Sequence, residues 1–193
     1  MTAVRVVGVD ISLASTGIAR ATIPDHGPAA TYTTTIGLAG KRRETLAQTA
    51  MRLDYLTGAI DEAVGSPDLA VVEGRYNIAE ANAGPVWALW WAVVIRLWAR
   101  GVPVAQMAPT TLKLYFTGSG RADKSLMLDT ARRVGVSGGD PVFGIPDGPG
   151  RFDVADAIAL ACAGAHRLGR PLIDRPDDTL AVVKWPTREG IPA

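Results

Sequence analysis

The chain has 193 residues, 48% of them hydrophobic, and its 20 basic and 19 acidic residues leave a formal net charge of +1. This length suits one domain with a sizeable core, whereas the near-neutral charge gives no general electrostatic argument for nucleic-acid binding. The single Cys162 excludes an intramolecular disulfide framework and is expected to be a buried filler residue in a reducing compartment.

Targeting and membrane signals are weak in this sequence. The first residues lack the charged segment, apolar run and cleavage site of a secretory signal, so we expect a cytoplasmic protein. The longest apolar run, residues 85–98, contains Arg96 and is shorter than the ~20 residues that a membrane span requires. We therefore expect no membrane partner.

The first part of the chain alternates between strand and helix patterns. Runs rich in β-branched residues predict strands at 4–10, 16–23 and 31–36, which short connections would join into an antiparallel meander. Apolar residues at three- and four-residue steps predict a helix over 41–64, and a short apolar strand follows at 69–73.

The second part is mostly helical. A helix is expected over 85–100, and its four tryptophans, spaced to share one face, predict a core or a subunit interface. A strand at 102–106, helices at 109–116, 122–134 and 151–166, and a Gly- and Pro-rich loop at 137–150 complete the pattern. This order predicts an α/β domain over 1–168, with helices on both faces of a mixed sheet, followed by an irregular surface tail at 169–193.

Two carboxylates interrupt the apolar helix expected at 151–166. Asp153 and Asp156 are three residues apart, which places them on one helical face about 5–6 Å apart at Cβ. Like charges on a buried helix need a cation, a proton or solvent. Asp10 and Glu73 each end a predicted strand, and ligands collect at the carboxyl ends of strands in α/β sheets.

A strand-end acid alone is more often a cap or a surface residue, but two of them together with the helical pair indicate a site. Oxygen ligands without a His or Cys cluster suit Mg²⁺ or Mn²⁺ better than zinc. Two such ions can activate water for attack on a phosphate. His26 and His166 are expected to be structural.

Four blocks of sequence together resemble a known family. They are residues 9–17, residues 72–76, the pair 108–113 and 118–124, and residues 153–159, Asp-Val-Ala-Asp-Ala-Ile-Ala. In this order they resemble the blocks of the RuvC-type Holliday-junction resolvases, over about residues 4 to 168. The resemblance implies a ribonuclease H-like fold with a mixed five-stranded sheet and helices on both faces. It also implies a homodimer, for which the tryptophan-bearing helix is the candidate interface.

The resemblance implies a metal-dependent endonuclease that resolves four-way DNA junctions by paired symmetric nicks, with two Mg²⁺ ions, or Mn²⁺, in each active site. It makes Asp10, Glu73, Asp153 and Asp156 the metal-binding catalytic carboxylates. Lys124 would be a further catalytic residue near the scissile phosphate. The expected DNA-binding residues are Tyr76, Arg75, Lys113, Arg121 and Lys124, with Tyr76 stacking at the opened junction centre. Further arginines would contribute to a local basic patch: Arg42, Arg43, Arg132 and Arg133.

The sequence also departs from the family pattern. Ile11 and Ser12 stand where the family usually has Pro-Gly, and the pair Gly74-Arg75 also differs. These changes leave open a nuclease with a broader preference for branched DNA such as flaps and forks, or a junction-binding protein that does not cleave. An actin- or sugar-kinase-like ATPase would need a second domain of similar size, which 193 residues do not hold.

Overall fold

The computed structural model describes residues 3–41, 43–74, 83–134 and 143–186. Its centre is a five-stranded sheet with the order β3-β2-β1-β4-β5. The first three strands form the predicted antiparallel meander, whereas β4 is parallel to β1 and β5 is parallel to β4. The strands are β1 (Val4–Asp10), β2 (Thr16–Ile23), β3 (Ala30–Ile36), β4 (Leu69–Glu73) and β5 (Val104–Met107).

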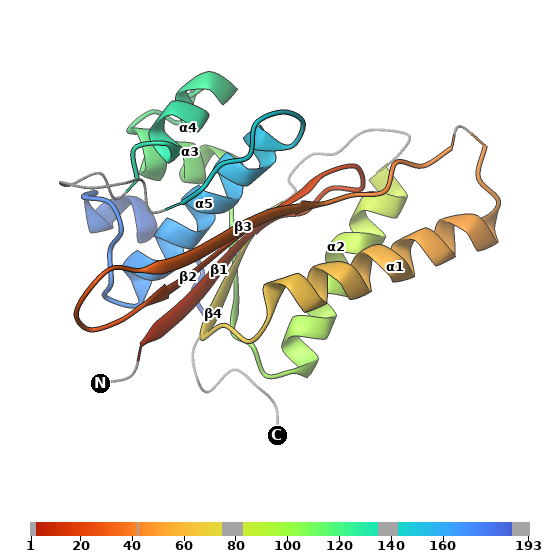
Figure 1. The fold of residues 1–193 in the computed structure, drawn as a ribbon, viewed down its shortest axis with the longest axis horizontal. Coiled ribbons are helices and arrows are strands. Elements are labelled where there is room, and N and C mark those ends of the chain that lie inside the picture. Colours follow the sequence, from red (N-terminus) through yellow and green to blue (C-terminus); the bar gives the residue numbers. More distant parts are fainter. Residues whose placement is uncertain (1–2, 42, 75–82, 135–142, 187–193) are drawn as a thin grey trace.

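Helices cover both faces of this mixed sheet, as predicted (Figure 1). On one face, α1 (Leu46–Val64) and α2 (Ala83–Ala99) enclose a core with Val7 and Val9 of β1. On the other face, α5 (Arg151–Arg167) packs on β1, β2 and β4, with α3 (Pro109–Thr117) and α4 (Lys124–Ala131) beside it. None of the helices in the described part of the chain combines the length and hydropathy needed to cross a membrane.

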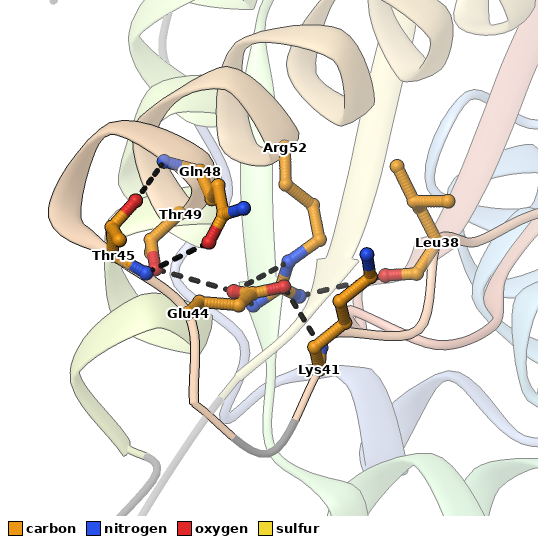
Figure 2. A network of polar contacts seen from close by, with 7 residues as sticks. All are labelled: Leu38, Lys41, Glu44, Thr45, Gln48, Thr49 and Arg52. Carbon is orange, nitrogen blue, oxygen red and sulfur yellow. Dashed lines mark hydrogen bonds and ion pairs between the residues drawn. The ribbon is translucent and has the colours of Figure 1, made fainter.

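Helix α1 begins at Leu46, five residues later than predicted. Thr45 is its N-cap and forms a capping box with Gln48, so the residues before it lie outside the helix. Glu44 accepts hydrogen bonds from Arg52 and Thr49 and from the backbone N–H of residue 41 (Figure 2). Arg52 holds the pKa of the Glu44 carboxyl below its usual range. Polar residues that had appeared helical therefore anchor the start of α1.

Helix α5 approaches the sheet closely because glycines face it. A Cβ on Gly8 would lie 2.0 Å from the carbonyl oxygen of Ala157, and a Cβ on Gly17 would lie 2.0 Å from that of Asp153. Side chains at these two strand positions would push the helix away. The small residues of α5, alanines for the most part, are buried against β1 and β2 in the resulting narrow space.

The tryptophans of α2 divide between core and surface. Trp90 is 4% exposed, whereas Trp91 and Trp98 are 53% and 52% exposed. The predicted face therefore straddles the edge of the core: Trp90 belongs to the core, as one of the two alternatives predicted, whereas the subunit interface stays a prediction for the exposed tryptophans. The exposed part has the composition of a partner surface.

The described part of the predicted tail packs on the domain. Leu180 and Val183 are buried in the core on the α5 side, and a short 3-10 helix, η1, spans Asp177–Leu180. Lys184 forms an isolated antiparallel bridge with Gln106 of the edge strand β5. These contacts cover the sheet edge, which otherwise offers unpaired backbone groups. The boundary at residue 168 stays a prediction.

Candidate active site

The two strand-end acids lie side by side at one edge of the sheet. Strands β1 and β4 are parallel neighbours whose last matched pair is Val9 with Val72, so Asp10 and Glu73 are the next residues of their strands. Side chains alternate between the faces of a sheet. Asp10 shares its face with Gly8, which abuts α5, and Glu73 shares its face with Val71, which belongs to the core on the α5 side. Both acids therefore project towards α5.

Helix α5 brings the second pair of acids to the same place. Asp10 is paired with Gly17 across β1 and β2, and the missing side chain of Gly17 makes room for the backbone of Asp153. Asp153 lies in the first turn of α5, where the helix dipole stabilises a negative charge. Asp156 follows almost one turn later on the same side of the helix. Gly17 thus determines how close this helical pair comes to Asp10.

The electrostatics of Asp156 show that these groups converge. The pKa of Asp156 is raised to about 7, first by burial and then by the charges of Asp10 and Asp153, while Lys113 and Lys124 act in the opposite direction. A carboxyl group responds to these neighbours only when they lie close to it. Three of the four predicted carboxylates and both predicted lysines therefore share one electrostatic environment.

The two lysines come from separate helices. Lys113 is on α3, and Lys124 is the first residue of α4, whose N-cap Asp123 accepts a hydrogen bond from the Leu126 N–H at 2.8 Å. The Lys124 ammonium lies 5.6 Å from the centroid of the Phe152 ring, within the range of a cation–π contact. Phe152 directly precedes Asp153, so this contact holds Lys124 beside the acids. Sequence reasoning had assigned no role to Phe152.

The turn after Asp10 is built by side chains. Thr16 is fully buried, and its hydroxyl accepts a hydrogen bond from the Ser12 N–H at 3.1 Å and donates one to the Ser12 carbonyl at 2.7 Å. The Ser12 hydroxyl accepts from the Ser15 N–H at 3.0 Å. Ser12 and Thr16 thus close the turn at the position where the sequence departs from Pro-Gly.

The donor set fits a divalent metal ion in its chemistry. Asp10 is 8% exposed, and its charge and that of Asp153 act on half-buried Asp156, so the three carboxylates repel one another unless a cation or a proton intervenes. Among the residues that the structure describes, no three His, Cys, Asp or Glu side chains stand close enough to hold an ion as they are. Oxygen donors of this kind suit Mg²⁺ or Mn²⁺.

The remaining candidates fall into two groups. Arg121 is exposed close to the start of α4, and other predicted arginines are exposed as well: Arg43, Arg132 and Arg133. Arg42, Arg75 and Tyr76 lie outside the described residues.

Cys162 is buried with a raised thiol pKa, and His166 Nδ1 lies 3.3 Å from the hydroxyl of Tyr115. The positions of Cys162 and His166 agree with the structural roles expected of them.

Comparison with known proteins identifies relatives of this chain. No protein-family model matches it. It is 35% identical over 122 residues to the crossover junction endodeoxyribonuclease RuvC of Anaeromyxobacter dehalogenans, which covers 61% of this chain and 60% of that protein. The chain thus spans less than two thirds of this relative. It is 30% identical over 177 residues to the RuvC of Corynebacterium efficiens, which covers 89% of this chain and 72% of that protein.

Solved structures show the same fold. Thermus thermophilus RuvC in complex with a Holliday junction substrate matches with a TM-score of 0.65 and 21% identity, over 86% of this chain and 97% of that chain. The mixed five-stranded sheet is thus the ribonuclease H-like sheet of these proteins. Since the identity to the Corynebacterium efficiens relative extends over more than two thirds of that protein, the chain belongs to the RuvC family of crossover junction endodeoxyribonucleases.

Proposed function

We propose that this protein is a metal-dependent endonuclease that resolves four-way DNA junctions by paired symmetric nicks. The observation that carries the proposal is the convergence of three carboxylates and two lysines at Asp156, beside the end of the strand that bears Glu73. The family membership supports it, and so does the Thermus thermophilus relative, which was solved with a Holliday junction substrate. We assign the nuclease domain to residues 1–168.

The proposed metal ligands are the four carboxylates Asp10, Glu73, Asp153 and Asp156. When bound there, two Mg²⁺ or Mn²⁺ ions supply an activated water and stabilisation of the leaving oxygen. The protein holds the acids on two strand ends and one helix, so each approaches the substrate phosphate from a rigid element. Ionised Asp156 is favoured by Lys113 and Lys124 and opposed by its burial.

The basic side chains bind the DNA backbone in this proposal. Lys124 contacts the ring of Phe152 and its charge acts on Asp156, so its ammonium would offset negative charge on the scissile phosphate. Lys113, Arg75 and Arg121 contact neighbouring phosphates, which supply most of the affinity for DNA. Tyr76 stacks on a base at the opened junction centre, since an aromatic face accepts any unpaired base.

A homodimer completes the proposal. Two symmetric nicks need two active sites, and a two-fold dimer presents two copies of the same site. Helix α2 exposes Trp91, Ile95 and Trp98, which are large apolar side chains on one surface. Large aromatic residues are typical of interface cores. We therefore assign the dimer interface to this surface of α2.

Cleavage of synthetic branched DNA tests the proposal. A four-way junction, a flap and a replication fork, each labelled on one strand at a time, are incubated with Mg²⁺ or with chelator. We expect symmetric paired nicks in the four-way junction that require the metal ion. Preferred cutting of the flap or the fork would replace the proposal with a broader branched-DNA nuclease. Junction binding without cleavage would replace it with a non-cleaving binding protein.

A further inference from the structure

Trp90 reaches the candidate active site from the opposite face of the sheet. Its side chain belongs to the core beneath α1 and α2 and packs edge-on against Trp87 and Trp91, with ring centroids 6.1 Å and 5.0 Å away. A buried indole normally keeps a hydrogen-bond partner for its N–H. Here the indole Nε1 donates to the carbonyl oxygen of Glu73 at a distance of 2.9 Å.

The Glu73 peptide lies where the pairing of β4 changes. Ala70 and Gly74 donate their N–H groups towards β5, to the carbonyls of Pro103 and Met107 at 2.9 Å and 2.8 Å. Backbone groups of successive strand residues point alternately to the two sides, so the Glu73 carbonyl faces the β1 side. It also lies one residue beyond the last matched pair of β1 and β4. The Trp90 indole therefore continues the bonding of β4 at the point where the β1 ladder ends.

The peptide between Glu73 and Gly74 is held at both of its polar atoms, by Trp90 at the carbonyl and by Met107 at the N–H. By strand alternation the carboxylate projects towards α5, whereas the indole approaches from the α2 side, so the two groups lie on opposite faces of the sheet. The Gly74 N–H is bonded to β5 on the other side of the strand. With both sides of the strand end held, the peptide cannot rotate freely, and the Cα–Cβ bond of Glu73 keeps its direction.

We infer that Trp90 is a positioning residue for Glu73, whose indole N–H holds the end of β4 so that the carboxylate faces Asp10 and α5. The inference rests on the proposed function, because it assumes that Glu73 binds a metal ion. Trp90 itself contacts neither substrate nor metal. Its effect passes through one backbone carbonyl, so removal of the N–H alone should weaken the metal site without altering the DNA surface.

Two replacements of Trp90 separate the hydrogen bond from the packing. Trp90→Phe removes the N–H together with part of the ring, whereas 3-benzothienylalanine at position 90 replaces only the N–H with sulfur in nearly the same shape. Mn²⁺ binding is measured without DNA from the electron paramagnetic resonance signal of the free ion. We expect up to about fivefold weaker Mn²⁺ binding in both proteins, because metal binding must then supply the order that one neutral hydrogen bond gave to the Glu73 peptide. The metal concentration for half-maximal junction cleavage should rise by the same factor.

The matched control is Trp87→Phe, which removes an indole from the same aromatic cluster but leaves the Trp90 N–H in place. It should bind Mn²⁺ as the wild type does, and junction binding in chelator should be the same in all variants. Wild-type Mn²⁺ affinity in the 3-benzothienylalanine protein would overturn the inference, even if Trp90→Phe does not fold. A wild type that neither binds Mn²⁺ nor cleaves junctions would instead overturn the proposed function, and the inference with it.

Discussion

Asp153 combines two properties at the scale of the single residue. It lies in the first turn of α5, and its charge acts on Asp156 together with that of Asp10. Replacing it with Asn keeps the shape and the polarity but removes the charge of a proposed metal ligand. We expect Asp153→Asn to lower the rate of junction cleavage by at least about a hundredfold. Removing a group that only hydrogen-bonds to a metal ligand already lowers activity by up to about a hundredfold. A single-turnover assay in Mg²⁺ measures the loss.

Junction binding provides the control for Asp153→Asn. In chelator, an electrophoretic mobility shift should show wild-type affinity, because phosphate contacts and not the acids supply the binding free energy. Nicking at the wild-type rate by Asp153→Asn would contradict the metal assignment.

The raised pKa of Asp156 makes stability depend on pH. Burial, followed by the charge of Asp10, raises this pKa from 3.8 to about 7. The folded state therefore binds a proton more tightly than the unfolded state, and ionising Asp156 costs stability. In chelator, the free energy of unfolding of the wild type should fall relative to that of Asp156→Asn as the pH rises from about 4 to about 7, by at most about 4 kcal/mol.

Urea denaturation at several pH values measures this difference. Well below the unfolded-state pKa of 3.8, Asp156 is protonated in both states, so the two proteins should differ by an amount that no longer changes with pH. If the free energies of unfolding of wild type and Asp156→Asn differed by the same amount at every pH, the pKa of Asp156 would not be raised in the folded protein.

At the scale of the element, the close approach of α5 to the sheet determines the site. A Cβ at position 17 would lie 2.0 Å from the Asp153 carbonyl oxygen, so a larger residue must move the start of α5 or the start of β2. We expect Gly17→Ala to destabilise the protein by about 1–3 kcal/mol, as overpacking of a tight core does. Cleavage should fall as well, because Asp153 and Asp156 shift away from Asp10. Thermal unfolding and the junction assay measure these effects.

A second Gly→Ala substitution separates the close approach from the general effect of glycine. Gly58 lies within α1, and a Cβ there would meet no atom within 4 Å. Gly58→Ala should stabilise the protein by up to about 1 kcal/mol through helix propensity, with unchanged cleavage. Equal changes in stability and cleavage in the two variants would show that the distance between α5 and the sheet does not determine the site.

At the scale of the whole molecule, the exposed surface of α2 predicts the oligomeric state. Trp98 is about half exposed, so a charge at this position does little harm to a monomer but prevents an apolar interface. We expect a wild-type dimer and a Trp98→Glu monomer in light scattering after size-exclusion chromatography. Val182→Glu is the control, because Val182 is 73% exposed in the C-terminal segment, and this variant should remain a dimer. A dimeric Trp98→Glu protein would place the interface elsewhere.

The sequence alone predicted the order of elements well, and it predicted their ends less well. The meander, the mixed sheet and helices on both faces are confirmed. Apolar residues recur every two residues in a strand and every three to four residues in a helix, and these patterns are local properties of the chain. The start of α1 was wrong because Thr45 ends the preceding segment with a capping box. Spacing placed Trp90 and Trp91 on one helical face, but it could not tell which of the two indoles is buried, because the packing of the core decides that.

By itself, the sequence predicted which residues would carry the chemistry: two acids that end strands, an acid pair on a helix, and lysines in two recognisable blocks. Only the tertiary structure decided that Asp10, Asp153, Asp156, Lys113 and Lys124 share one environment. It also revealed the close fit at Gly17, the Phe152 contact of Lys124 and the hydrogen bond from Trp90 to Glu73. The physical reason is that periodicity constrains one element at a time, whereas distance, burial and electrostatic coupling arise only when elements pack together.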